Sequence, residues 1–181
     1  MRRRPILLGL LALLSSTLVA GAAMPAGAGS KPPAVPPAVQ VPAGQEVVLD
    51  VVGKGVQIYD CRPSATDPNV LAWTFREPAA VLYGHGGRPV GIHFRGPTFE
   101  SFDGSSVVGA LQASVPSPTP GSIPWLLLAA ASNQGDGVLA RVDYVQRLET
   151  RGGVAPAGAC DPAGDATVAV PYRARYVFYA D

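Results

Sequence analysis

The carboxyl-terminal stretch Val168-Ala169-Val170-Pro171-Tyr172-Arg173-Ala174-Arg175-Tyr176-Val177-Phe178-Tyr179 alternates between two kinds of side chain. Arg173 and Arg175 belong to one set, and apolar or aromatic residues make up the other. Side chains two residues apart share a face of a β-strand. The stretch is therefore predicted to be a strand whose arginines face solvent. Its core-facing residues are predicted to be Val168, Val170, Tyr172, Ala174, Tyr176 and Phe178.

The same period of two recurs towards the amino terminus, as far as Gln45. Residues 56–61 alternate, and Gly53-Lys54-Gly55 predicts a turn that joins them in a hairpin to the apolar run before it. Glu77-Pro78 is predicted to separate two further short strands, residues 71–75 and 79–83. The other predicted strands cover residues 89–95, 107–113, 123–131 and 138–149. In the last of these, Arg141, Asp143, Arg147 and Glu149 are predicted to form a charged outer face.

The composition favours the same fold class. The 181 residues include 21 glycines and 19 prolines, and no segment shows the i, i+3, i+4, i+7 stripe of an amphipathic helix. A proline inside a helix costs about 3 kcal/mol, so such a chain favours short strands joined by turns. We predict one all-β domain over residues 45–181, an antiparallel β-sandwich or a closed β-barrel of about eight to ten short strands.

The amino terminus has the pattern of a secretory signal. Three arginines at residues 2–4 precede an apolar run over residues 6–20, which is shorter than the roughly 20 residues that span a bilayer. Ala20-Gly21-Ala22 and Ala26-Gly27-Ala28 both resemble cleavage sites. We predict a signal peptide within residues 1–28 and a secreted protein without a membrane span after cleavage. An amino-terminal membrane anchor is the alternative.

Residues 29–44 are rich in proline, which fixes φ and lacks an amide donor. We predict an extended arm there, either a spacer or a strap across the domain. Removal of the signal lowers Lys+Arg from 14 to 11, against 13 acidic residues, which leaves a net charge near −2. No basic run remains to contact phosphates, so we expect no nucleic-acid partner.

Cys61 and Cys160 are the two cysteines of the chain. Export places them in an oxidising environment, where a disulfide is expected and two free thiols are the alternative. The chain has no CxxC pair, and its two histidines, His85 and His93, are separated in sequence. We therefore predict no metal site. Gly53-Lys54-Gly55 lacks the third glycine and the following helix of a dinucleotide site, so we expect no cofactor.

Several short motifs stand in a fixed order along the chain. They are GVQIYDC (55–61), HFRGPTF (93–99), DGS (103–105), IPWLL (123–127), VQR (145–147) with TRGG (150–153), and the Tyr172…Phe178-Tyr179 ending. In these residues, over roughly 43–181, the chain resembles the DUF3455 family of exported bacterial and fungal proteins with no assigned function. The resemblance implies a secreted β-domain with a Cys61–Cys160 bridge, and it implies no catalytic residues.

Alternation places His93 beside Arg95 on the face opposite Val90, Ile92 and Phe94. A histidine can change charge near neutral pH, so His93 could contact a ligand or act as a general base. The alternative is a solvent-facing or turn-anchoring histidine.

Glu100 and Asp103 form the second candidate feature, because paired carboxylates serve glycoside hydrolysis. The alternative is that Asp103 caps the turn that it begins. Trp73 follows a polar loop and could stack on a sugar. The candidate binding residues are His93, Arg95, Glu100, Asp103 and Trp73.

Three functions remain open. The preferred one is a secreted, monomeric, non-catalytic binding or structural module, at the cell surface or in the medium, that contacts a glycan or a protein. The first alternative is a small extracellular hydrolase that uses His93 with Asp103 or Glu100. The second is a barrel that carries a small apolar ligand.

Overall fold

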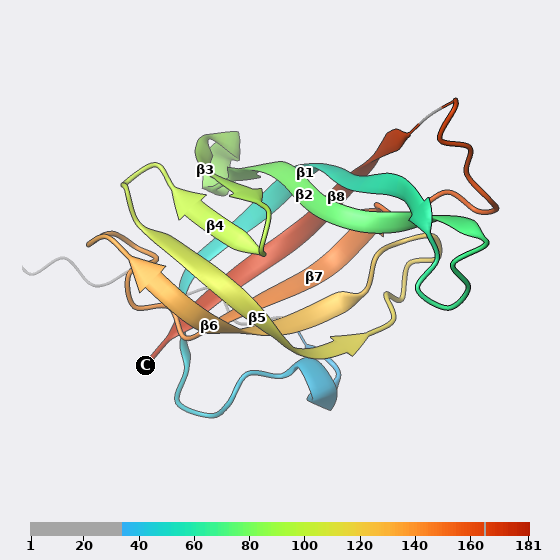
Figure 1. Ribbon diagram of the computed structural model, residues 1–181. Helices are drawn as coiled ribbons and strands as arrows, with labels where there is room; N and C mark the ends of the chain where they lie inside the picture. The colour runs from blue at the N-terminus through green and yellow to red at the C-terminus, as the bar shows by residue number, and fades with distance from the viewer. Residues whose placement is uncertain (1–33, 165) are drawn as a thin grey trace, which may run out of the picture.

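A computed structural model describes residues 34–164 and 166–181, which fold into a closed antiparallel barrel of eight strands (Figure 1). Each strand pairs with the next in the chain, and the last pairs with the first. The strands are β1 (Glu46–Pro63), β2 (Leu71–Tyr83), β3 (Pro89–Phe94), β4 (Thr98–Ser101), β5 (Ser106–Val115), β6 (Trp125–Gln134), β7 (Tyr144–Gly152) and β8 (Thr167–Ala180). The predicted all-β class is confirmed, and the architecture is the barrel.

Helical structure in the described residues is limited to two short 3-10 turns, η1 (Pro37–Val39) and η2 (His85–Gly87). None of these residues belongs to a helix of the length and hydropathy needed to cross a bilayer. The predicted signal peptide lies outside the described residues, as does the first part of the predicted arm.

The turn predicted at Gly53-Lys54-Gly55 was wrong, because β1 runs through these residues without a break. Both glycines are required for space within the sheet. A Cβ on Gly53 would lie 2.6 Å from Cε2 of Tyr176, and one on Gly55 would lie 2.0 Å from the carbonyl oxygen of Ala79. The two glycines therefore allow neighbouring atoms to pack closely against β1, and they do not form a turn.

The break predicted at Glu77-Pro78 was also wrong, because β2 continues through Pro78. Pro78 pairs with Gln57 beside a β-bulge between Ile58 and Tyr59. A bulge interrupts the regular ladder, and it is one of the places where a strand accepts a proline.

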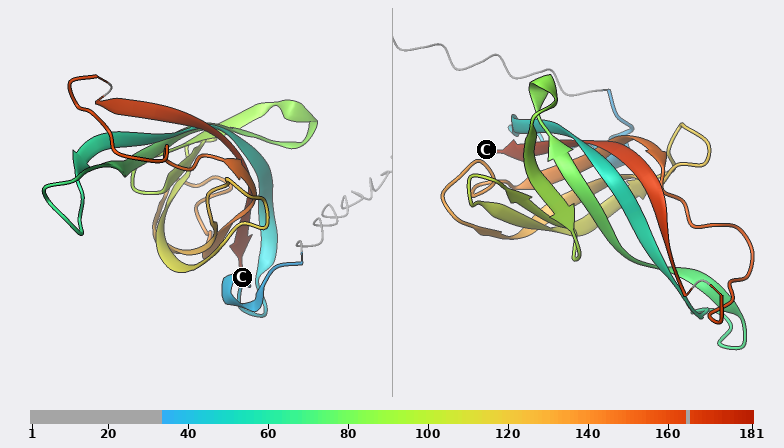
Figure 2. Two further views of the ribbon diagram at one scale, coloured as in Figure 1. Left: turned by 90° about the vertical axis from the view of Figure 1, so that its right-hand side faces the viewer. Right: turned by 90° about the horizontal axis from the view of Figure 1, so that it is seen from above.

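The pairing of β1 with β8 closes the barrel and runs from Glu46 opposite Ala180 to Asp60 opposite Thr167. The outer parts of β1, β2 and β8 extend together beyond the other strands (Figures 1 and 2). Loops 64–70 and 153–164 lie side by side at the tip of this three-stranded extension (Figure 2). The molecule therefore has a closed barrel and a projecting sheet of its three longest strands.

The barrel interior is packed with apolar side chains from all around the sheet. The inward face predicted for β8 is confirmed for Tyr172, Ala174, Tyr176 and Phe178, which are in this core, whereas Val168 and Val170 are only half-buried and lie outside it. The other buried members are Val51, Ala80, Leu82, Phe99, Val107, Ile123, Leu128, Leu139, Val142 and Val145.

The face predicted for the segment 138–149 was wrong. β7 begins only at Tyr144, and residues 138–141 form a turn. Val145 belongs to the barrel core, whereas Leu148 belongs to a second cluster on the outside. Alternation then directs Arg147 inward with Val145. The prediction failed because a second apolar cluster outside the barrel makes both faces of β7 apolar.

The segment 34–45 lies across this outer cluster as a strap (Figure 1). Val39 of η1 has no exposed surface, and its carbonyl accepts a hydrogen bond from Gln146 Nε2. The Tyr179 hydroxyl donates to Gln146 Oε1 at 2.6 Å. A hollow of about 760 Å3 remains between the strap and the barrel wall. The strap thus buries side chains that a bare barrel would expose.

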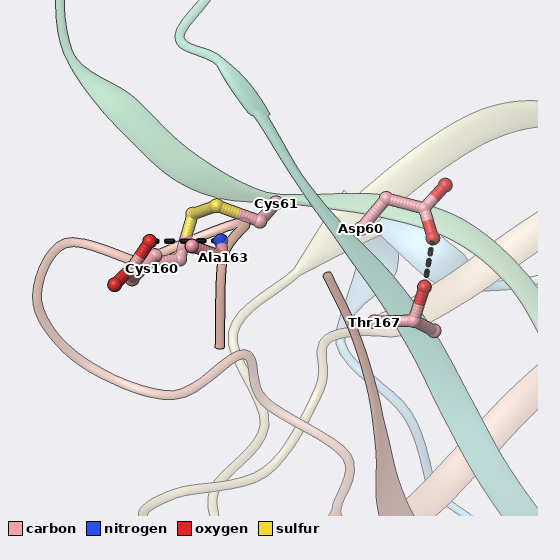
Figure 3. Close-up of a disulfide and its surroundings, with 6 residues drawn as sticks. Asp60, Cys61, Cys160, Ala163 and Thr167 are labelled. Atoms are coloured by element: carbon pink, nitrogen blue, oxygen red, sulfur yellow. Dashed lines mark hydrogen bonds between the residues drawn. A yellow bond between two sulfur atoms is a disulfide. The ribbon is translucent and has the colours of Figure 1, made fainter. Parts of the chain in front are cut away.

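A disulfide joins Cys61 on β1 to Cys160 in the loop before β8 (Figure 3). The backbone amide of Cys61 also donates to the carbonyl of Ala166 at 2.9 Å. On the other side of the strand, the Asp60 carboxylate accepts a hydrogen bond from Thr167 Oγ1 at 3.0 Å (Figure 3). The predicted bridge is confirmed, and it fastens the loop to the tip of the extension.

Replacing both cysteines, Cys61→Ser with Cys160→Ser, is expected to lower the free energy of unfolding by about 4 kcal/mol, because the bridge closes a long loop in the unfolded chain. The two cysteines are 99 residues apart. Urea unfolding measures the loss. Wild-type protein unfolded with a reductant should match the double variant, and identical midpoints for the oxidised wild type and the variant would contradict the bridge.

Gly55→Ala is expected to destabilise the protein by about 3 kcal/mol or more, because the new methyl group would overlap backbone atoms of β2. Gly164→Ala is the matched control, since its Cβ would meet only an atom 3.6 Å away. Thermal unfolding of both variants measures the difference. Equal Tm values for Gly55→Ala and wild type would show that β1 and β2 do not pack as closely as described.

Candidate functional site

His93 lies on the face of β3 opposite Val90, Ile92 and Phe94, as predicted, and this face is the one inside the barrel. Gly91 and His93 are the buried residues of β3, and the side chains between them are half-buried on the other face. The His93 ring stacks on Phe99 with 4.0 Å between centroids, and Nδ1 donates to the Thr98 carbonyl at 2.9 Å. Alternation divides a strand into two faces, but packing against Phe99 decides which of them is inside.

A small polar group accompanies His93 in the interior. The hydroxyls of Tyr172 and Tyr176 are 3.0 Å apart, and Tyr176 makes an edge contact with the His93 ring. Arg147 Nε donates to the carbonyl of Pro124 at 3.1 Å, and its guanidinium also hydrogen-bonds the Tyr176 side chain. The one charge in this group is therefore anchored on a backbone oxygen and a phenol.

Burial keeps the titratable members of this group uncharged. Burial, against the opposing bond to Thr98 and with a smaller contribution from the charge of Arg147, lowers the pKa of His93 to about 4. Burial also raises the pKa of both Tyr172 and Tyr176. At neutral pH His93 is a neutral imidazole with its Nδ1 proton engaged, which makes it a weak base in a closed environment.

Arg95 and Glu100 lie outside the barrel, on the side of the wall away from the His93 ring. Arg95 is exposed, and its Nε donates to Glu77 at 2.9 Å. Glu100 is exposed on β4, where it sits opposite Ile92, while its neighbour Phe99 is inside. The structure therefore does not bring either residue together with His93.

Asp103 is occupied by hydrogen bonds within the turn between β4 and β5. Its carboxylate accepts from Ser105 Oγ at 2.6 Å, from the Ser105 amide at 3.0 Å and from the Val138 amide at 2.8 Å. These bonds, with the Ser105 hydroxyl first, hold the pKa of Asp103 well below its usual range. Asp103 thus ties this turn to the loop that precedes β7, which is the structural role considered as the alternative.

Trp73 lies near the beginning of β2, in the projecting sheet. It is half-buried and pairs with Cys61 of β1. Phe75 follows on the same strand with about half of its surface exposed, and its ring meets Tyr59 edge-on. The five candidate residues are thus distributed among the interior, the outer wall, one turn and the projecting sheet.

The face of the sheet away from the Trp73 side chain carries a chain of alternating charges. Asp60 accepts from Arg62 at 2.7 Å and from Arg76 at 2.8 Å, and Glu77 joins Arg76 to Arg95. Burial would raise the pKa of Asp60, but the bonds from Arg62 and Thr167 and the charge of Arg76 outweigh it and lower the pKa. A hollow of about 350 Å3 lies over these groups, whose charges largely compensate one another.

A second charged feature was missed by the sequence analysis. On the outer faces of β1, β8 and β7, Lys54 stands opposite Arg173, and Arg173 stands opposite Arg151. All three side chains are exposed. We call these three residues the cation row. The signal that could have found it is the outward face of Arg173 combined with the strand order.

The described residues contain no group of three or more His, Cys, Asp or Glu side chains that could hold a metal ion.

Comparison with known proteins identifies the family. The model of the family described as "Protein of unknown function (DUF3455)" matches residues 42–180. This chain belongs to the DUF3455 family. No curated protein and no solved structure matches it. The family description assigns no function to DUF3455 proteins.

The buried histidine of this DUF3455 protein makes its stability depend on pH. His93 has a pKa near 6.5 when unfolded and about 4 when folded, so the unfolded state binds more protons between these values. Stability is therefore complete above pH 6.5 and falls as the pH drops towards 4. Between pH 7 and pH 5 we expect a loss of about 2 kcal/mol from this residue.

Urea unfolding of wild type and His93→Gln at pH 7 and pH 5 measures this contribution. The variant is expected to be less stable at pH 7 but to lose less stability between the two pH values. The same loss in both proteins would mean that His93 is not buried as a neutral imidazole.

Proposed function

We propose that this protein is an exported, non-catalytic binding module that contacts an extracellular polysaccharide through the outer face of its barrel. The observation that carries the proposal is the separation of the groups that could perform chemistry. His93 is inside the wall, Glu100 is outside it, and the Asp103 carboxylate is engaged by the turn that contains it.

A hydrolase needs an acid and a base that reach the same bond. His93 has a low pKa and donates its Nδ1 proton to a backbone carbonyl. The pKa of Asp103 is held low by three donors, so it is a poor general acid. These features favour a structural role for both residues.

A carrier of a small apolar ligand needs an internal cavity. Here the interior is occupied by large side chains, among them Phe99, which contacts Tyr176 and Phe178 edge-on. The Tyr176 ring is seated directly against Gly53. Such packing favours a barrel that serves as a rigid support for its outer surface.

Export is supported by the Cys61–Cys160 disulfide, since disulfides persist in oxidising compartments. The signal pattern predicted in residues 1–28 agrees with that location. A secreted support with polar outer strands is suited to recognition, and charged rows on those strands provide the contacts.

Binding and hydrolysis can be measured together. The secreted protein is mixed with a panel of neutral and acidic polysaccharides, and both the bound fraction and the reducing sugar released are recorded. We expect retention on at least one polysaccharide without release of reducing ends. Release that is lost in His93→Gln would support the hydrolase instead, and no retention on any member of the panel would refute the proposal.

A further inference from the structure

The cation row has a defined geometry. Lys54, Arg173 and Arg151 are direct partners across β1, β8 and β7, so their side chains share one face of the sheet. Direct partners in antiparallel pairs have Cβ atoms about 4.5–5.5 Å apart. The residues beside Arg173 in the chain, Tyr172 and Ala174, are in the barrel core, which directs Arg173 outward. Three positive charges therefore cross the outer wall in one line.

In the part of the chain that the structure describes, no acidic side chain forms an ion pair with the positive charges of the cation row. Six ion pairs occur among the described residues, and none of them includes Lys54, Arg151 or Arg173. The Lys54 ammonium lies 5.1 Å from the centroid of the Tyr83 ring, a contact that also favours a positive charge. Like charges directly opposite each other destabilise a sheet. A bound anion would remove this repulsion.

Arg175, the next arginine along β8, differs from Arg173 because acidic side chains pair with it. Arg175 is held by Asp50 of β1 at 2.6 Å and by Glu149 of β7 at 3.0 Å. These bonds, with Asp50 first, raise the pKa of Arg175. The strands that supply two acids to Arg175 thus supply two cations to Arg173. The repulsion in the row is local and specific to it.

The ligand follows from the charge and the spacing of the row. Guanidinium groups bind carboxylates through paired hydrogen bonds. Neighbouring strands are about 4.8 Å apart, which is close to the length of one pyranose unit. The row therefore matches a polymer that carries a carboxylate on each sugar. Acidic residues outnumber basic ones in the predicted mature chain, so the net charge opposes an acidic polymer and the row has to supply the attraction locally.

We infer that Lys54, Arg173 and Arg151 form the binding site for an acidic polysaccharide built from uronic acids, with Arg173 at its centre. The inference rests on the proposed function and names its ligand class and its site.

The test measures binding of polygalacturonate to the secreted protein at low salt. Arg173→Gln is expected to bind about tenfold more weakly, which corresponds to loss of one charged hydrogen-bonding group. Arg141→Gln removes an exposed arginine in the loop before β7 and is the matched control, expected to bind as wild type does. Methyl-esterified polygalacturonate, which has the same backbone without the charge, is expected not to bind.

A second variant separates binding from folding. Arg173→Glu places an acid between Lys54 and Arg151, so its Tm without polymer is expected to rise by about 2–4 °C. The same variant is expected to lose polygalacturonate binding. A folded Arg173→Glu that binds as wild type does, or that has a lower Tm, would overturn the inference.

The outcomes distinguish the two proposals. If wild type binds only neutral or only phosphorylated polymers, or if Arg173→Gln has no effect, the uronic acid site is wrong and the binding module remains. If wild type binds no polysaccharide at all, both proposals fail.

Discussion

Closure of the barrel depends on the contact between Tyr176 and Gly53. The Tyr176 ring occupies the volume that a side chain at position 53 would need, and so β8 can approach β1 closely. That contact fixes which face of β8 is inside. It places Tyr176 against Phe99 and His93, and it places Arg173 and Arg175 on the outer wall. The interior aromatic cluster and the exterior charges therefore follow from the same pairing.

The fold was largely predictable where the two faces of a strand differ in polarity. β8 has arginines on one face and aromatic residues on the other, and its orientation was predicted correctly. β3 and β7 each place a polar side chain inside, His93 and Arg147. The two faces of β3 were predicted correctly but not which of them is inside, and the inner face of β7 was predicted wrongly. The alternation of residue types along a strand shows only which side chains are polar. It does not show that a ring stack or a hydrogen bond to a backbone carbonyl can make a polar side chain stable inside a barrel.

The candidate sites were harder to predict, because residues near in sequence are separated by the barrel wall. His93 and Glu100 are close in the chain, yet β3 and β4 direct them to opposite sides. Conversely, Lys54, Arg151 and Arg173 are distant in sequence and adjacent in space. Their alignment depends on a β-bulge between Leu148 and Arg151, whose position sequence periodicity does not reveal.

A filled barrel leaves its outer wall as the place where binding can evolve. There an arginine can be neutralised by acids from the neighbouring strands, as Arg175 is, or left facing other cations, as Arg173 is. The second arrangement costs stability, and no acid among the described residues forms an ion pair with the row. Binding sites commonly retain such unfavourable local arrangements, because the ligand supplies the missing partner. Unpaired like charges on an otherwise balanced surface therefore point to function more clearly than the buried histidine does.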